Sequence, residues 1–236
     1  MIFLLLDVDD RVFELFTTTE TLSDTKRNRK ALAKIPHPEW IPAALRQYDK
    51  EVGVRRLGWK TPDDGSGRPA CRGRYDFPPL EDIYGDWEGA AYFDMPDEPG
   101  LEPENPRLRD FKIVDIFVGE AGVGLYHDAA QDPGLYYLEF GNGDEPYPLH
   151  VDFAGYLQLL RHTMGYLYWP KVVLSLLPND GRNPAYRTSV DRPEKFRRDM
   201  TAWVPEFDYD AFVACYHAVK LQNYTPSSES EGTTTT

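Results

Sequence analysis

The hydrophobic pattern is most regular in the middle of the chain, where three apolar runs are separated by turn residues. The first run, Phe111–Val118, is apolar on both faces except at Lys112 and Asp115, which is typical of a strand covered on both sides. The other two runs are Val123–His127 and Leu135–Phe140. Glycines and an Asp-Pro-Gly sequence separate the runs, and such residues favour tight reversals of the chain. The pattern predicts an antiparallel meander with Phe111–Val118 as an inner strand.

A short strand and a helix are predicted directly after the meander. Gly141–Gly143 contains the strongest hairpin signal of the chain. Tyr147–Val151 follows as an edge strand, because Pro148 cannot donate a hydrogen bond to a sheet. Asp152 then stands where a helix N-cap is expected. The apolar positions at helical spacing are Phe153, Tyr156, Leu157, Leu160 and Met164. We expect this helix to pack on the sheet with that stripe.

Weaker patterns in the first hundred residues predict further elements. Ile2–Leu6 and Val12–Phe16 are apolar enough to form paired strands, and Glu88–Met95 predicts another strand. Between Val12–Phe16 and Glu88–Met95, a helix is predicted to begin near Pro38 or Pro42, since proline is tolerated in a first helical turn. The apolar stripe of this helix consists of Ile41, Ala44, Leu45, Tyr48 and Val52.

Two basic stretches interrupt these elements. Gly58–Pro79 is predicted to be irregular, because glycines, prolines and charged residues break any apolar pattern. Arg68, Arg72 and Arg74 make it locally basic, and we interpret them as a balance for neighbouring acids. A basic helix is predicted over residues 24–35, and a solvated face explains it better than a nucleic-acid contact in so acidic a chain.

Helices dominate the pattern after the meander and its helix. They are predicted at Tyr168–Leu177, in a segment that starts at Asp191, and in a last segment capped by Asp208. No core-forming residue remains from Thr225 onward, so this tail is predicted to be disordered.

The fold class that these patterns predict is α+β, an antiparallel sheet in meander order flanked by helices, with a helical C-terminal extension. The expected organisation is an α+β core at residues 1–164, a helical extension packed on that core at 165–224, and a disordered tail at 225–236.

The order of these blocks resembles the SUKH superfamily, which includes bacterial immunity proteins and yeast cell-wall regulators. The resemblance lies in the stretches FKIVDIFVGEAGVGLYHD, PGLYYLEFGNGDEP and HVDFAGYLQLL, with HPEWIPAALRQYDKEVG similar to the family's early helix. It covers Pro36–Met164 and consists of apolar runs and turns rather than a chemical motif. The resemblance implies a small α+β domain that binds a cognate toxin and neutralises it by covering it, without catalysis.

The net charge narrows the class of partner. The 39 acidic residues exceed the 26 basic residues by 13, which gives a formal net charge of −13. Such a charge disfavours nucleic acid and suits a basic protein partner, such as a basic toxin domain.

Cys71 and Cys215 show neither metal-ligand spacing nor a disulfide framework, so we expect a cytoplasmic protein with reduced thiols. No apolar run is long enough for a signal peptide or a membrane span, and no membrane association is expected.

A proline-rich acidic loop is the expected partner-binding element. Prolines forbid regular structure between residues 94 and 106, and an exposed loop on a rigid sheet is a common binding surface. A second pair of acids follows the predicted hairpin turn. The candidate contact residues are Asp94, Asp97, Glu98, Glu102, Glu104, Asp144 and Glu145.

Two alternatives to a toxin-binding module stay open. A hydrolase could use Asp7 as a nucleophile and Asp9 as a proton carrier, as in haloacid-dehalogenase-type phosphatases, although the usual Gly-Thr after the second Asp is absent. It could instead use a site near His127 and His150, each close to a carboxylate in sequence, where a metal could bind. A regulatory scaffold without a toxin partner is the second alternative. We expect no catalytic residue and no cofactor for the preferred hypothesis.

Overall fold

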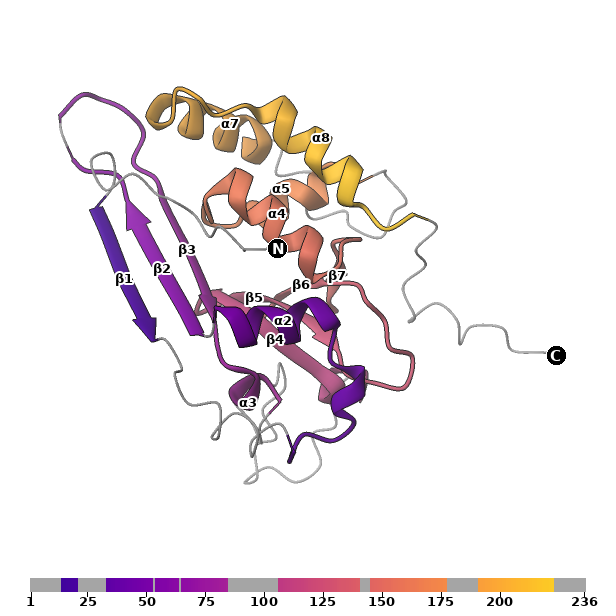
Figure 1. The fold of residues 1–236 in the computed structure, drawn as a ribbon. Coiled ribbons are helices and arrows are strands. Elements are labelled where there is room, and N and C mark those ends of the chain that lie inside the picture. Colours follow the sequence, from indigo (N-terminus) through magenta and orange to yellow (C-terminus); the bar gives the residue numbers. More distant parts are fainter. Residues whose placement is uncertain are drawn as a thin grey trace.

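The computed structural model describes residues 14–20, 33–52, 54–63, 65–84, 106–140, 145–177 and 191–222. It confirms the predicted α+β class, with two antiparallel sheets and flanking helices (Figure 1). One sheet has the order β1-β2-β3, with β1 at Glu14–Glu20, β2 at Val54–Lys60 and β3 at Arg72–Phe77. The other has the order β4-β5-β6-β7, with β4 at Phe111–Val118, β5 at Ala121–Tyr126, β6 at Tyr136–Glu139 and β7 at Tyr147–Pro148.

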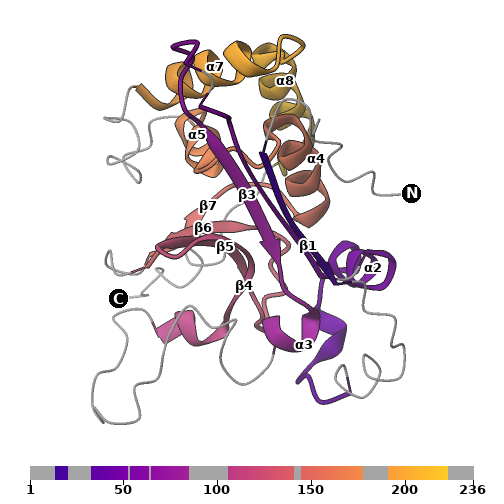
Figure 2. The same cartoon turned by 90° about the vertical axis from the view of Figure 1, so that its left-hand side faces the viewer.

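Helices α2 and α4 lie on one side of the first sheet, and α7 and α8 lie above its end (Figure 2). The α-helices are α2 at Ala43–Glu51, α3 at Leu80–Ile83, α4 at Phe153–Thr163, α5 at Trp169–Ser175, α7 at Asp191–Trp203 and α8 at Tyr209–Val219. Two 3₁₀ helices, η1 at Pro38–Trp40 and η2 at Pro106–Asp110, precede α2 and β4. Within the described residues, no helix is long and apolar enough to cross a membrane.

Strand β4 has the predicted bounds but not the predicted place. It lies at the end of its sheet and pairs there with β5, so the prediction of an inner strand is wrong. Its two apolar faces are nevertheless covered, because Val114 and Phe117 join the main core while Phe111 and Ile113 join a second, smaller cluster. A register shift after Ile113 allows this change of face. The apolar residues on both faces of β4 thus predicted correctly that both faces are buried. Burial on both faces does not determine whether a strand lies inside a sheet or at its edge.

Strand β3 and the end of β2, Gly58–Lys60, lie in the segment Gly58–Pro79, which was predicted to be mostly irregular. Glycines, prolines and arginines concealed an alternation with a period of two, which is the signature of a half-buried strand. Along β2 and β3 the buried residues are Leu57, Trp59, Gly73, Tyr75, Asp76 and Phe77. The exposed residues between them are Arg56, Lys60, Arg72 and Arg74.

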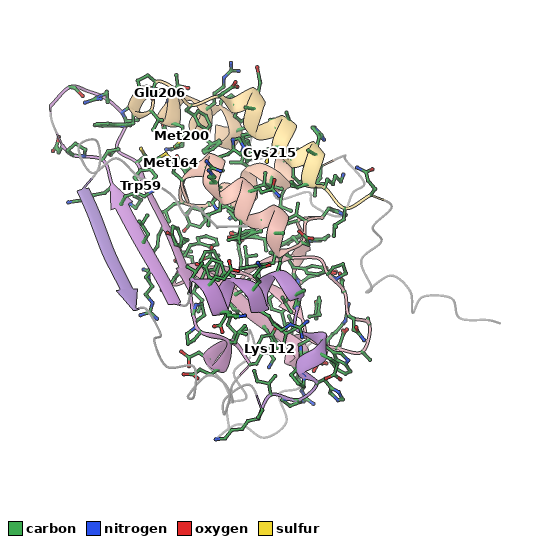
Figure 3. All side chains as sticks on the ribbon, viewed as in Figure 1. Trp59, Lys112, Met164, Met200, Glu206 and Cys215 are labelled. Atoms are coloured by element: carbon green, nitrogen blue, oxygen red, sulfur yellow. The ribbon has the colours of Figure 1, made fainter. Side chains whose placement is uncertain are left out.

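Trp59 attaches the β2–β3 ribbon to the C-terminal end of α4. It is paired in register with Gly73, and a Cβ atom at position 73 would lie 2.3 Å from the indole Cε2 atom. The indole Nε1 donates to the carbonyl oxygen of Met164 at 2.6 Å, and the two residues lie side by side in Figure 3. Because only glycine leaves room for the indole, this position requires glycine for packing.

The predicted helix after the meander is confirmed as α4. The Asp152 carboxylate accepts a hydrogen bond from the Gly155 N–H at 2.8 Å, which is the expected N-cap. Phe153 and Leu157 are buried in the main core, where Phe153 packs edge-on against Phe77 with ring centroids 5.9 Å apart. The helix therefore packs on the sheets with its apolar stripe, as predicted.

The last helices share the core of α4. Helix α8 packs against α4, and α7 packs against α5 (Figure 1). Phe196 of α7 and Phe212 of α8 belong to the same buried cluster as Phe153. The predicted cap of α8 is confirmed, because the Asp208 carboxylate accepts from the Ala211 N–H at 2.9 Å. The strands expected at Ile2–Leu6 and Glu88–Met95, and the tail from 225, lie outside the described residues.

Candidate functional site

A groove of about 990 Å³ lies between the β2–β3 ribbon and the turn that joins β4 to β5. We call it the ribbon groove. One wall is the β2–β3 ribbon, from which Arg56, Lys60, Arg72 and Arg74 line the groove. Phe117, Val118, Gly119 and Glu120 form the opposite wall, and Leu167 and Tyr168 close one end. Four separate stretches of the chain therefore build one site.

The register of β2 and β3 gathers the basic side chains on one face. Lys60 lies opposite Arg72, and Gly58 lies opposite Arg74. Residues directly opposite each other in an antiparallel pair project to the same side of a sheet. The exposed face of the ribbon is thus basic, although the whole chain is acidic.

Asp76 orients two of these arginines. Its carboxylate accepts from Arg56 Nε at 2.6 Å and from an Arg74 terminal nitrogen at 3.0 Å. Asp76 is itself buried, so both guanidinium groups are held against a fixed anchor. This arrangement restricts the conformations of Arg56 and Arg74 before any ligand arrives.

The Asp76 backbone connects this wall to a buried carboxylate. The Asp76 N–H donates to Asp115 at 2.8 Å, and the Tyr156 hydroxyl donates to the other carboxylate oxygen at 2.7 Å. Asp115 is fully buried, and this burial raises its pKa to about 7 despite the two hydrogen bonds that favour the charged form. The carboxylate therefore links β3, β4 and α4 beneath the groove wall.

The free edge of β3 is covered by the chain that leaves α4. The Arg74 N–H donates to the Gly165 carbonyl at 2.7 Å, and the Leu167 N–H donates to the Arg72 carbonyl at 3.0 Å. These bonds place Tyr168 at the end of the groove, where its hydroxyl donates to the Glu120 carboxylate. The groove end is thereby built from backbone pairing rather than from loop conformation alone.

A smaller pocket of about 350 Å³ shares Cys71, Arg72 and Tyr168 with the ribbon groove and extends to Tyr166 and Lys195. Burial raises the pKa of the Cys71 thiol to about 11 and that of the Tyr166 phenol to about 12. Both groups are therefore protonated at neutral pH and are poor nucleophiles or bases. Lys195 donates to the Tyr166 hydroxyl at 3.0 Å, which further ties this pocket into the fold.

Most of the predicted contact residues lie outside the described part of the chain. These are Asp94, Asp97, Glu98, Glu102, Glu104 and Asp144. Glu145 is described and is exposed, as a contact residue requires. The structure thus leaves the acidic loop as a prediction.

The two histidines of the alternative site have different neighbours. The His127 ring nitrogen Nε2 lies 2.7 Å from the Pro36 carbonyl oxygen, with the ring edge-on against Tyr84. His150 has a positive φ of 55°, and its carbonyl accepts from the Leu221 N–H at 2.9 Å. In the described ranges no group of three His, Cys, Asp or Glu side chains could hold a metal ion.

The carboxylates next to these histidines already have structural partners. Asp128 accepts two hydrogen bonds from Arg107, at 2.9 and 2.7 Å, and Asp152 caps α4. Asp7 and Asp9, the other hydrolase candidates, lie outside the described residues.

Comparison with protein-family models, with curated proteins and with solved structures found no match to this chain.

The sequence alone did not predict the ribbon groove, because Arg72 and Arg74 were assigned to an irregular segment. The alternation of arginines with Gly73 and Tyr75 at residues 72–75 was the signal that could have found it.

Proposed function

We propose that this chain is a non-catalytic protein-binding module of the immunity type, which neutralises a toxin by covering it. The observation that carries the proposal is the ribbon groove, with its wall of pre-oriented arginines and its aromatic end at Tyr168. Arginine and aromatic residues are enriched where proteins bind one another. The resemblance to immunity proteins in the sequence supports the same reading.

The shape and chemistry of the groove favour a protein over a small molecule. Small-molecule pockets are mostly apolar with few polar groups, whereas four charged side chains line one wall here. The wall is also a regular ribbon, along which an extended polypeptide can lie.

A second contact with the same partner is proposed for the acidic stretches of the sequence. Asp94–Glu104 with Asp144 and Glu145 is the proposed contact for basic groups of the toxin. Opposite charge raises the association rate more than the affinity, and salt screens it. Neutralising Glu98, Glu102 and Glu104 should therefore flatten the salt dependence of association.

Photo-crosslinking from position 119 tests the proposal. Gly119 lines the groove and is exposed, and a Cβ atom there would meet nothing within 4 Å, so a photoreactive residue is accommodated. The matched control carries the same residue at Lys50, which is exposed on α2 outside the groove. The tagged variants are irradiated in lysate of the source cells.

We expect one protein to crosslink from position 119 and not from position 50. Expressed alone, that protein should arrest growth, and co-expression of this chain should restore growth. A crosslinked protein without toxicity would favour the regulatory scaffold, and equal labelling from both positions would refute binding at the groove.

A further inference from the structure

Two like charges lie opposite each other on the basic face of the ribbon. Lys60 and Arg72 lie directly opposite each other, and like charges at such positions destabilise a sheet. On its other side Lys60 is paired in register with strand β1. Arg72 instead borders the backbone of Leu167, is exposed, and forms no ion pair within the described part of the chain. A ligand anion at Arg72 would supply the missing countercharge.

The spacing of the arginines matches an extended peptide. Arg72 and Arg74 are two residues apart on the exposed face of β3, and alternate residues of a strand are separated by about 6.8 Å. An extended peptide lying over the exposed face of β3 presents every second side chain toward that face with the same repeat. Carboxylates at alternate positions therefore reach both guanidinium groups, and arginine can bind a carboxylate through two hydrogen bonds.

We propose that the ribbon groove binds an extended acidic segment of the partner protein, in which acidic residues alternate with other residues. This inference rests on the proposed function for the existence of that partner. The segment lies along β3, with one carboxylate at Arg72 and the next at Arg74. Beyond the arginines it contacts Leu167 and Tyr168, which close the groove.

Charge favours a peptide over a nucleic acid as the occupant. The basic face is short, because Arg56 and Lys60 are four residues apart, about 14 Å along a strand. The chain as a whole has a formal net charge of −13. A nucleic acid extends its phosphates beyond so short a basic face, whereas a peptide with few carboxylates remains within the patch.

A peptide titration followed by NMR tests the inference without the natural partner. Two peptides of about ten residues are compared, each with two glutamates among threonines. In the separated form one threonine lies between the glutamates, and in the adjacent form the glutamates are neighbours. The two peptides therefore have the same composition and charge. Adjacent side chains of an extended peptide point to opposite faces, and the adjacent form can place only one carboxylate on the ribbon. We expect the separated form to bind about fivefold more tightly, with shifts confined to β2, β3, 117–120 and 167–168.

Variants locate the contact. Arg72→Ala should weaken binding of the separated form about fivefold and abolish its advantage over the adjacent form. Arg161→Ala removes an exposed arginine from α4, outside the groove, and should change neither affinity. Arg72→Gln keeps the three side-chain carbons nearest the backbone and a polar end without the charge, and gives the same test if the alanine variant fails to fold.

The outcomes separate this inference from the proposed function. Equal affinity of the two peptides, preference for a lysine peptide, or tighter binding of a single-stranded oligonucleotide would overturn the inference. If a protein still crosslinks from position 119 in that case, the binding module stands and its partner segment is of another kind. Selective peptide binding without any crosslinked protein would instead refute the proposed function.

Discussion

Replacing Asp115 by Asn should remove a large pH dependence of stability from this protein. Asp115 is fully buried, and burial raises its pKa from 3.8 to about 7 in the folded state. Between these values the folded protein holds a proton that the unfolded chain has lost, so stability falls as pH rises. From about pH 5 to about pH 7 the loss is about 3 kcal/mol, at 1.36 kcal/mol for each pH unit.

Asparagine mimics the protonated carboxyl at this site. Its oxygen can accept from the Asp76 N–H, and its amide can donate to the Tyr156 hydroxyl oxygen, as a protonated Asp115 would. The variant should therefore lack the stability loss, and its advantage over the wild type should grow by about 3 kcal/mol between about pH 5 and about pH 8.

Urea denaturation at several pH values measures this difference. Subtracting the wild-type free energy of unfolding from that of Asp115→Asn at each pH cancels the titration of distant groups. A difference that stays constant across the range would show that the buried carboxylate does not titrate near pH 7, and would refute the reasoning.

Three further substitutions test separate parts of the fold. Tyr156→Phe removes a hydrogen-bond donor to the Asp115 carboxylate. It should lower the free energy of unfolding by about 2 kcal/mol above pH 7 and by less below pH 5. An equal loss at both pH values would contradict a hydrogen bond to the charged carboxylate. Gly73→Ala should lower the free energy of unfolding by about 3 kcal/mol, because the new Cβ overlaps the Trp59 indole. The control Gly119→Ala should change it by less than about 0.5 kcal/mol. Similar melting temperatures for the two variants would contradict this packing. Asp152→Ala removes the cap of α4 and should cost about 1 kcal/mol in chemical denaturation, and a neutral result would mean that the cap contributes nothing to stability.

The elements that sequence reasoning found are those with strong local signals. The bounds of β4 followed from an uninterrupted apolar run, and the caps at Asp152 and Asp208 followed from side chains that satisfy backbone N–H groups three residues later. Such signals depend on neighbours in sequence. They identified the meander and the helices without fixing how β4 is placed in its sheet.

The groove could not be predicted in the same way because its residues are distant in sequence. Arg72, Phe117 and Tyr168 come together only after β3, β4 and the α4–α5 connection have packed. Asp115 was visible as an acid in an apolar run, but its partner Tyr156 lies on another element. A polar residue at a buried strand position was the available signal, and it marked a tertiary contact rather than a turn.

The most direct test of the central claim, that the ribbon groove binds a protein partner, is the affinity of the crosslinked partner for groove variants. Isothermal titration calorimetry would compare the wild type with Arg72→Glu and with Arg161→Glu, which places the same charge change on α4. We predict that Arg72→Glu raises the Kd at least about tenfold, whereas Arg161→Glu leaves it within about twofold of the wild type. Equal Kd values for the two variants would contradict binding at the groove.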